Sequence, residues 1–418
     1  MNTNPPWSGP TRWRRRAAAC GALLSLATVG WPVAAGPAEP AATEPATVAA
    51  LADLGLALLR QSAPGNAVVS PLATAVALGM VHAGTAGPTE REIEALFGPG
   101  KAGAMAWRQG LPALHKQLQG GAPALAMASR MWVESSAAPG LSAGYARRLA
   151  TRFGADAARL SFEDSEAARG QINRWTAEHS AGRIAELLPA GGVTPATQLV
   201  LTTAVYFRSP WEKPFDAERT APLPFASAPG LSHDVPTLRD LRSVAQAQVD
   251  GARVLELPFA QSAFALLLAV PDDGRSLEQL QLSFTGSALA RWRSALQSTR
   301  CELALPKFDI QPQSASLKPA LQGLGVKTVF SASANLRPML GRQAHNLHLD
   351  DVHHAAGITV DEQGGEAVAA AAATVRAKSF AVPAPACAVD RAFLFAVIHR
   401  ATGTPLFVGR VTEPVAKP

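Results

Sequence analysis

The chain has 418 residues, 48% of them hydrophobic and 17% charged, and a formal net charge of +6. This composition supplies a large apolar core and excludes an intrinsically disordered chain, and three cysteines are too few for a scaffold built on disulfides. Whether the positive charge indicates binding to nucleic acids or membrane surfaces depends on where along the chain it lies.

The first 35 residues are typical of a secretory signal peptide. Four arginines precede the apolar run AAACGALLSLATVGWPVAA, and Val33 and Ala35 fit the small-residue positions before a cut at Gly36. A membrane anchor is the alternative, but the leucine-rich core is shorter than the roughly 20 residues that span a bilayer. Removing residues 1–35 lowers the net charge from +6 to +2, so we expect no nucleic-acid partner.

We therefore expect a secreted or periplasmic protein whose mature form has no membrane segment. Residues 36–47 are rich in proline and alanine and predict a flexible segment, and residues 48–418 contain no linker that would divide them, which predicts a single domain. Two cysteines, Cys301 and Cys387, remain in the mature chain. In an oxidising compartment they either pair or stay buried as thiols, and the sequence leaves both possibilities open.

Helical patterns come early in the mature chain and strand patterns later. Apolar residues at helical spacing predict a helix over 46–60, Pro71 opens a second helix that reaches Val81, and 166–180 predicts a third. Apolar runs typical of strands follow at 197–207, 253–257, 263–270, 301–305, 356–361 and 392–399. Because helices and strands do not alternate regularly, the pattern predicts an α+β fold.

Motifs for common catalytic chemistry are absent: there is no glycine-rich phosphate loop, GxSxG, HExxH or CxxC. Four histidines, His345, His348, His353 and His354, lie close in sequence and raise the hypothesis of a metal site. The surrounding alternation is typical of a strand, which sends successive side chains to opposite faces. The pattern therefore favours neither a metal site nor an enzyme.

Residues 358–380, ITVDEQGGEAVAAAAATVRAKSF, carry the most informative pattern. An apolar strand ends at Asp361-Glu362, two glycines and a run of small residues follow, and a basic tip comes at 376–379. A helix here would have no apolar face to bury, and a long loop without secondary structure is usually functional. Small side chains also suit a strand that enters an existing sheet without clashes.

Seven blocks, taken in order, resemble the serpin family, and we expect a bacterial-type, inhibitory member. The blocks are NAVVSPLATAVALGMVHAGTAGPTEREI (66–93), INRWTAEHSAGRIAELLP (172–189), LVLTTAVYFRSPWEKPF (199–215), VLELPF (254–259), LALPKFDI (303–310), ITVDEQGGEAVAAA (358–371) and PLFVGRV (405–411). The resemblance implies the serpin fold, with three β-sheets, eight or nine helices and an exposed reactive-centre loop at about 362–385.

The resemblance also implies a function: a suicide inhibitor of serine proteases that is itself no enzyme and needs no cofactor. The protease cleaves the loop and forms an acyl-enzyme, and the freed segment enters the main sheet as a new strand before the acyl-enzyme is hydrolysed. We expect a monomer. A non-inhibitory serpin that acts as a binding or carrier protein, and an inhibitor of a cysteine protease, are the alternatives.

By the same resemblance, Glu362 and Gly364 match the hinge at which the loop leaves the sheet. Gly365 departs from the pattern, because the family prefers threonine or serine there, and glycine makes ordering costlier by about 0.5–1 kcal/mol. The remaining hinge positions are Glu366, Ala367, Val368, Ala369 and Ala370. The last four of them keep the family's preference for small residues.

The usual loop length places the reactive bond between Lys378 and Ser379. A lysine there suits the acidic specificity pocket of trypsin-like proteases, which are therefore the expected partners. Arg376 is the alternative if the loop is two residues shorter. Counting back from Phe393 instead places the bond near Phe380–Ala381, and these alternatives remain open.

The family also clusters two serines, an asparagine and a histidine where the main sheet parts, a site called the shutter. Ser70 and His353 are assigned to it, whereas Ala73 and Thr203 stand where the second serine and the asparagine would be. We expect a weaker latch with a different hydrogen-bond network, such as a bond from His353 to Thr203. Trp211 is assigned to the breach at the top of the sheet, where the loop first enters, although a role in the core is equally compatible.

Overall fold

The structure is a computed structural model that describes residues 45–119, 125–136, 141–340, 347–364 and 384–415. The predicted signal peptide and residues 36–44 of the predicted flexible segment lie outside these residues. The prediction is wrong for 45–47, which begin a helix and include the fully buried Thr47. None of the described helices is both long enough and apolar enough to cross a lipid bilayer.

Helices dominate the N-terminal part of the described chain, as the sequence predicts. Helix α1 (Pro45–Gln61) buries its leucines on one face, and α2 (Pro71–His82) is buried along its entire length. Ser70 caps α2 by accepting a hydrogen bond from the backbone nitrogen of Ala73. The further helices are α3 (Pro88–Ala95), α4 (Gly100–Met105), the π-turn η1 (Ala106–Gly110), α5 (Leu111–Gln119), α6 (Ala143–Phe153) and α7 (Ser165–His179).

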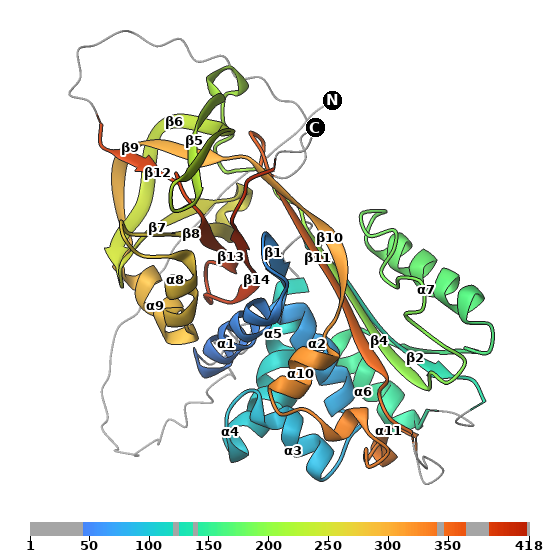
Figure 1. Ribbon diagram of the computed structural model, residues 1–418. Coiled ribbons are helices and arrows are strands. Elements are labelled where there is room, and N and C mark those ends of the chain that lie inside the picture. The colour runs from blue at the N-terminus through green and yellow to red at the C-terminus, as the bar shows by residue number, and fades with distance from the viewer. Residues whose placement is uncertain (1–44, 120–124, 137–140, 341–346, 365–383, 416–418) are drawn as a thin grey trace, which may run out of the picture. The chain divides into compact units, whose positions relative to one another are not determined.

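A five-stranded sheet separates α2 from α7 (Figure 1). Side chains of β2 alternate between the two: Met131 and Val133 belong to the core that includes α2, whereas Trp132 packs with Ile172 of α7. In spatial order the strands are β10 (Phe308–Ser316), β11 (Asp351–Val360), β4 (Leu199–Phe207), β2 (Leu125–Glu134) and β3 (Ala157–Leu160).

The two central strands of this sheet, β11 and β4, are parallel neighbours. Their paired residues run from Asp351 opposite Val200 to Gly357 opposite Tyr206. On its other side β11 pairs antiparallel with β10, and β4 pairs antiparallel with β2. The parallel pair therefore lies between two antiparallel ones.

A second, nine-stranded sheet contains most of the C-terminal half. The long strand β6 pairs with β5 and β9 and, near its end, with β7, so by hydrogen-bond pairing the described strands form two continuous sheets where three were expected. The order is β1 (Ala67–Val69), β14 (Pro405–Val411), β13 (Phe393–His399), β8 (Phe264–Pro271), β7 (Ala252–Pro258), β6 (Leu231–Val249), β9 (Gln297–Pro306) and β12 (Ala386–Ala388), with β5 (Ala221–Ala228) beside β6.

Short helices complete the fold, and the α+β prediction is confirmed. Of the eleven α-helices in the described part of the chain, eight have seven or more residues, in agreement with the expected number. The remaining elements are α8 (Leu277–Ser283), α9 (Gly286–Ala295), α10 (Lys318–Gly323), α11 (Arg337–Leu340) and the 3-10 turns η2 (Ala217–Arg219), η3 (Ala260–Ser262) and η4 (Thr328–Phe330).

Candidate functional site

The hinge, residues 361–364, follows the end of β11, and its glutamate is held by two partners. The Thr220 hydroxyl donates to Oε1 of Glu362 at 2.9 Å, and the Lys307 ammonium lies 2.9 Å from Oε2. Burial alone would raise the pKa of Glu362, but the hydrogen bonds from Lys307 and Thr220 outweigh it and hold this pKa below its usual range. The carboxylate is therefore a charged anchor for the hinge.

Only glycine fits at position 364. Its φ is +118°, and a Cβ added there would lie 2.5 Å from the carbonyl oxygen of Ser209 and 2.6 Å from the backbone nitrogen of Trp211. The turn is closed by Asp361, whose Oδ1 accepts from the backbone nitrogens of Gln363 at 2.8 Å and of Gly364 at 3.0 Å. Asp361 was not among the predicted site residues, although an aspartate two residues before a turn is a recognisable signal.

Trp211 joins the hinge to the segment that follows β4. Its indole nitrogen donates to the carbonyl oxygen of Asp361 at 2.8 Å. Its backbone nitrogen donates to the carbonyl oxygen of Gln363, also at 2.8 Å. The indole is 3% exposed and stacks on Phe259 with ring centroids 4.7 Å apart. Trp211 thus belongs to the core and at the same time contacts the hinge, and its role as the breach residue stays a prediction.

At the centre of the sheet, Ser70 contacts His354 and not the predicted His353. The Ser70 backbone nitrogen donates to Nε2 of His354 at 3.1 Å, and its hydroxyl donates to the carbonyl oxygen of Leu406 at 2.7 Å. The sequence assigned His353 to this site, but successive residues of β11 point to opposite faces, and it is His354 that meets Ser70. Ala73 is fully buried and contributes its backbone nitrogen, which donates to Ser70 Oγ.

Burial determines the charge of the shutter histidine. It lowers the pKa of His354 to about 4, and a backbone hydrogen bond with Thr203 opposes this only in part. His354 is therefore neutral at physiological pH. This agrees with Nε2 being the acceptor of the bond from Ser70, since a protonated imidazole has no lone pair to offer.

Thr203 of β4 has other partners on the neighbouring strands than the one predicted. It lies opposite His354 on β11 and opposite Ser129 on β2, and its hydroxyl hydrogen-bonds to Oγ of Ser129 at 2.9 Å. The expected bond between His353 and Thr203 is wrong. Ser129 was missed because only the register of two strands far apart in sequence reveals it.

Within the described part of the chain, the histidines considered for a metal site are not part of a group that could hold a metal ion. His345 lies outside the described residues, and His353 and His354 lie on opposite faces of β11. Among the described residues, the group that could hold a cation is His82 with Glu90 and Glu94. The Arg108 guanidinium already contacts both of these carboxylates, so part of their negative charge is offset without a metal.

The two cysteines of the predicted mature chain form a disulfide, which settles the question left open by the sequence. Cys301 of β9 and Cys387 of β12 have Cα atoms 5.8 Å apart, and both are fully buried. In sequence, Cys387 follows the predicted reactive bond Lys378–Ser379 by a few residues.

The other predicted site residues lie outside the described residues: Gly365, Glu366, Ala367, Val368, Ala369, Ala370, Arg376, Lys378, Ser379 and Phe380–Ala381.

Comparison with known proteins adds three kinds of likeness. A family model described as "Serpin (serine protease inhibitor)" matches residues 49–414. A serine protease inhibitor of Cyanea capillata is 30% identical over 375 residues, which cover 86% of this chain and 95% of that protein. A leukocyte elastase inhibitor of Xenopus laevis is 30% identical over 376 residues, covering 87% and 97%.

Solved structures share the fold. Uncleaved ovalbumin superposes with a TM-score of 0.77 at 26% identity, covering 88% of this chain and 100% of that one. A complex of thyroxine-binding globulin with thyroxine gives 0.78 at 22% identity, covering 88% and 99%. The fold is thus common to proteins named as protease inhibitors and to one named for binding a small molecule, so the fold alone does not separate these functions.

Proposed function

The chain belongs to the serpin family, and from this premise we propose that it is a suicide-substrate inhibitor of trypsin-like serine proteases. The observation that carries the proposal is the parallel pair of β11 and β4. A chain that turns back at the hinge and runs down between these strands would be antiparallel to both. Its insertion exchanges one parallel ladder for two antiparallel ones, which are slightly more stable per residue.

The energetics of insertion favour an irreversible step. Each inserted residue gains backbone hydrogen bonds worth on the order of 1 kcal/mol net. The uncleaved form is then metastable and persists because a kinetic barrier, and not equilibrium, separates it from the inserted form. A protease that has cleaved the loop and is still covalently attached would be displaced with the inserted strand before hydrolysis frees it.

The hinge geometry supports insertion that begins at the breach. The paired residues of β11 and β4 reach Gly357 and Tyr206, whereas the hinge beyond them is connected to the β4 side through Trp211. The contacts there are individual hydrogen bonds and one ion pair, which can break one at a time. The fully buried centre around His354 must part later, so it sets the resistance to opening.

Lys378 is the residue that we propose to occupy the protease's specificity pocket, with Ser379 after the cleaved bond. The acidic pocket of a trypsin-like protease binds an extended cation. Arg376 and the Phe380–Ala381 region are the alternative positions. We further propose that the protein acts outside the cytoplasm, because a buried disulfide is typical of oxidising compartments. We also propose that it acts as a monomer.

The test is incubation of the purified mature protein with trypsin, followed by denaturing electrophoresis and mass spectrometry. We expect a covalent complex that resists SDS and a released C-terminal peptide that begins at Ser379. Lys378→Ala should abolish the complex, whereas the matched control Arg376→Ala should retain it. The opposite result would move the reactive bond to Arg376, and cleavage of native protein without any complex would contradict inhibition and favour a carrier protein.

A further inference from the structure

The disulfide secures a strand that is otherwise weakly held. Strand β12 has three residues and lies at the edge of the nine-stranded sheet, beside β9 (Figure 1). Its parallel pairing is limited to Ala386 with Glu302, Cys387 with Leu303, and Ala388 with Ala304. So short an edge strand has little stability from backbone hydrogen bonds alone.

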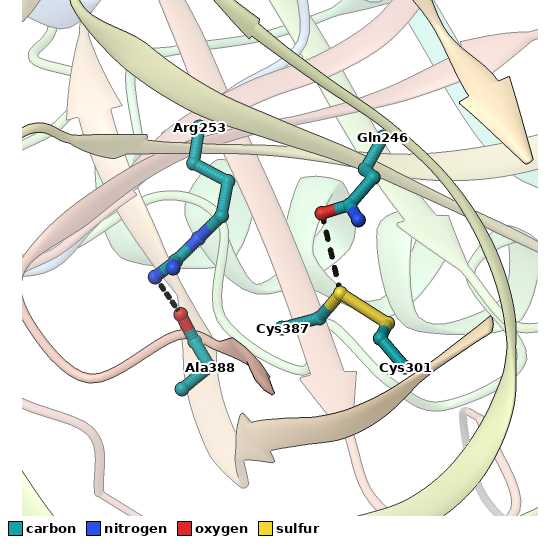
Figure 2. Close-up of a disulfide and its surroundings, with 5 residues drawn as sticks. All are labelled: Gln246, Arg253, Cys301, Cys387 and Ala388. Atoms are coloured by element: carbon teal, nitrogen blue, oxygen red, sulfur yellow. Dashed lines mark hydrogen bonds between the residues drawn. A yellow bond between two sulfur atoms is a disulfide. The ribbon is translucent and has the colours of Figure 1, made fainter. Parts of the chain in front are cut away.

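Two side-chain contacts and the covalent bond add to this pairing. Figure 2 shows the Cys301–Cys387 bridge between the two strands, with Gln246 Oε1 3.2 Å from the sulfur of Cys387. The Arg253 guanidinium donates to the carbonyl oxygen of Ala388. Of these links, the disulfide is the one that thermal motion cannot break.

Strand β12 lies at the hinge end of the five-stranded sheet, because β9 pairs with β12 and the residue after β9 contacts the hinge. Ala304 of β9 pairs with Ala388 of β12. Three residues further along the chain, Lys307 forms its ion pair with Glu362 of the hinge. The chain therefore leaves the fold at the hinge and re-enters it at β12 within reach of the same end of β9.

This placement gives cut and uncut chains different freedom. A strand inserted between β11 and β4 runs away from the hinge end at about 3.3 Å per residue. In an uncut chain, each inserted residue moves the chain away from β12 and leaves one residue fewer for the return. Deep insertion without cleavage therefore requires β12 to detach from β9, whereas a cut chain leaves β12 where it is.

We propose that the Cys301–Cys387 disulfide is a clamp that prevents insertion of the uncut loop, so that the loop enters the sheet only after cleavage. The proposal rests on the inhibitory function proposed above. Both sulfurs belong to residues that are fully buried, so a thiolate in solution cannot reach them in the folded protein. The bond is therefore a permanent clamp and not a readily reversible redox switch.

The test compares the native protein with the double variant Cys301→Ala/Cys387→Ala during incubation at 37 °C. Fresh samples of both should form the covalent complex with trypsin. The variant should then lose inhibitory activity at least about tenfold faster, and mass spectrometry should find its chain intact with a raised melting temperature. The matched control Arg253→Ala removes a contact of β12 but keeps the disulfide, and its activity should persist nearly as long as that of the native protein.

Equal lifetimes of the native protein and the double variant would overturn the clamp. If the double variant does not fold, Cys301→Ala/Cys387→Ser, which leaves a polar side chain beside Gln246, supplies the same comparison. If fresh native protein forms no complex with trypsin, the inhibitory function fails. The conversion of the intact double variant to a more heat-stable form then still decides on the clamp, because that readout requires no protease.

Discussion

The two ends of the segment between β11 and β12 are held in different ways. At the hinge, Asp361, Glu362 and Gly364 are held by hydrogen bonds and one ion pair. At β12, Cys387 is held by a buried covalent bond. The hydrogen bonds and the ion pair at the hinge can break one after another, whereas the disulfide at β12 cannot break by thermal motion. In the mechanism proposed above, the loop would therefore enter the sheet from the hinge end while its other end stays in place.

The largest effect is expected from crowding the hinge with Gly364→Ala. The added Cβ would lie 2.5 Å from a backbone oxygen at a φ of +118°, so the turn must distort. We expect a loss of about 2–4 kcal/mol in the free energy of unfolding, measured by urea denaturation. Gly274→Ala is the matched control: its φ is also positive, at +78°, but nothing lies within 4 Å, which limits its cost to about 1 kcal/mol. Equal losses would show that the hinge is not tightly packed.

A smaller effect is expected when the shutter is titrated. Because the pKa of His354 is lowered to about 4, its unfolded form binds a proton first as the pH falls through about 6.5. The stability contributed by neutral His354 is therefore complete above pH 6.5 and declines as the pH falls from there to about 4. Between pH 6.5 and 5 this amounts to roughly 2 kcal/mol.

The variant His354→Gln isolates this contribution from those of the other buried histidines. Its urea-unfolding free energy should fall by roughly 2 kcal/mol less than that of the native protein between pH 6.5 and 5. His353→Gln is the comparison variant: burial also lowers the pKa of His353, so this variant should lose its own share of the pH dependence. The bond between Ser70 and His354 should remain in it. If the unfolding free energy of the His354 variant depends on pH as strongly as that of the native protein, the neutral, buried state assigned to His354 is contradicted.

The one-residue error at the shutter shows where prediction from the sequence succeeds and fails. The apolar runs at 197–207 and 392–399 predict β4 and β13 well because burial on both faces leaves a continuous apolar pattern. The choice between His353 and His354 depends on which face of β11 meets α2, and a strand offers both faces equally. The partners Ser129, Thr220 and Lys307 are brought to the site by register and packing between segments distant in sequence, which no local pattern encodes.

The smallest effect is expected at the charged anchor of the hinge. Glu362→Gln removes the ion pair with Lys307 but leaves an acceptor for the Thr220 hydroxyl. Since the Glu362 side chain is 16% exposed, we expect a loss of about 1 kcal/mol in the free energy of unfolding at low salt, which 1 M sodium chloride should reduce. The exposed Glu302→Gln should change little, and a salt-independent loss in the Glu362 variant would show that packing and not charge holds the hinge.

The most direct test of the central claim is hydrogen exchange of β4 and β11 before and after a protease cuts the loop, with the melting temperature measured on the same samples. If the loop inserts between these strands, amides in 200–206 and 351–357 should become markedly more protected, and the melting temperature of the cut protein should rise well above that of the uncut one. Unchanged protection and an unchanged melting temperature in a cleanly cut protein would contradict insertion, and with it the inhibitory mechanism proposed for this chain.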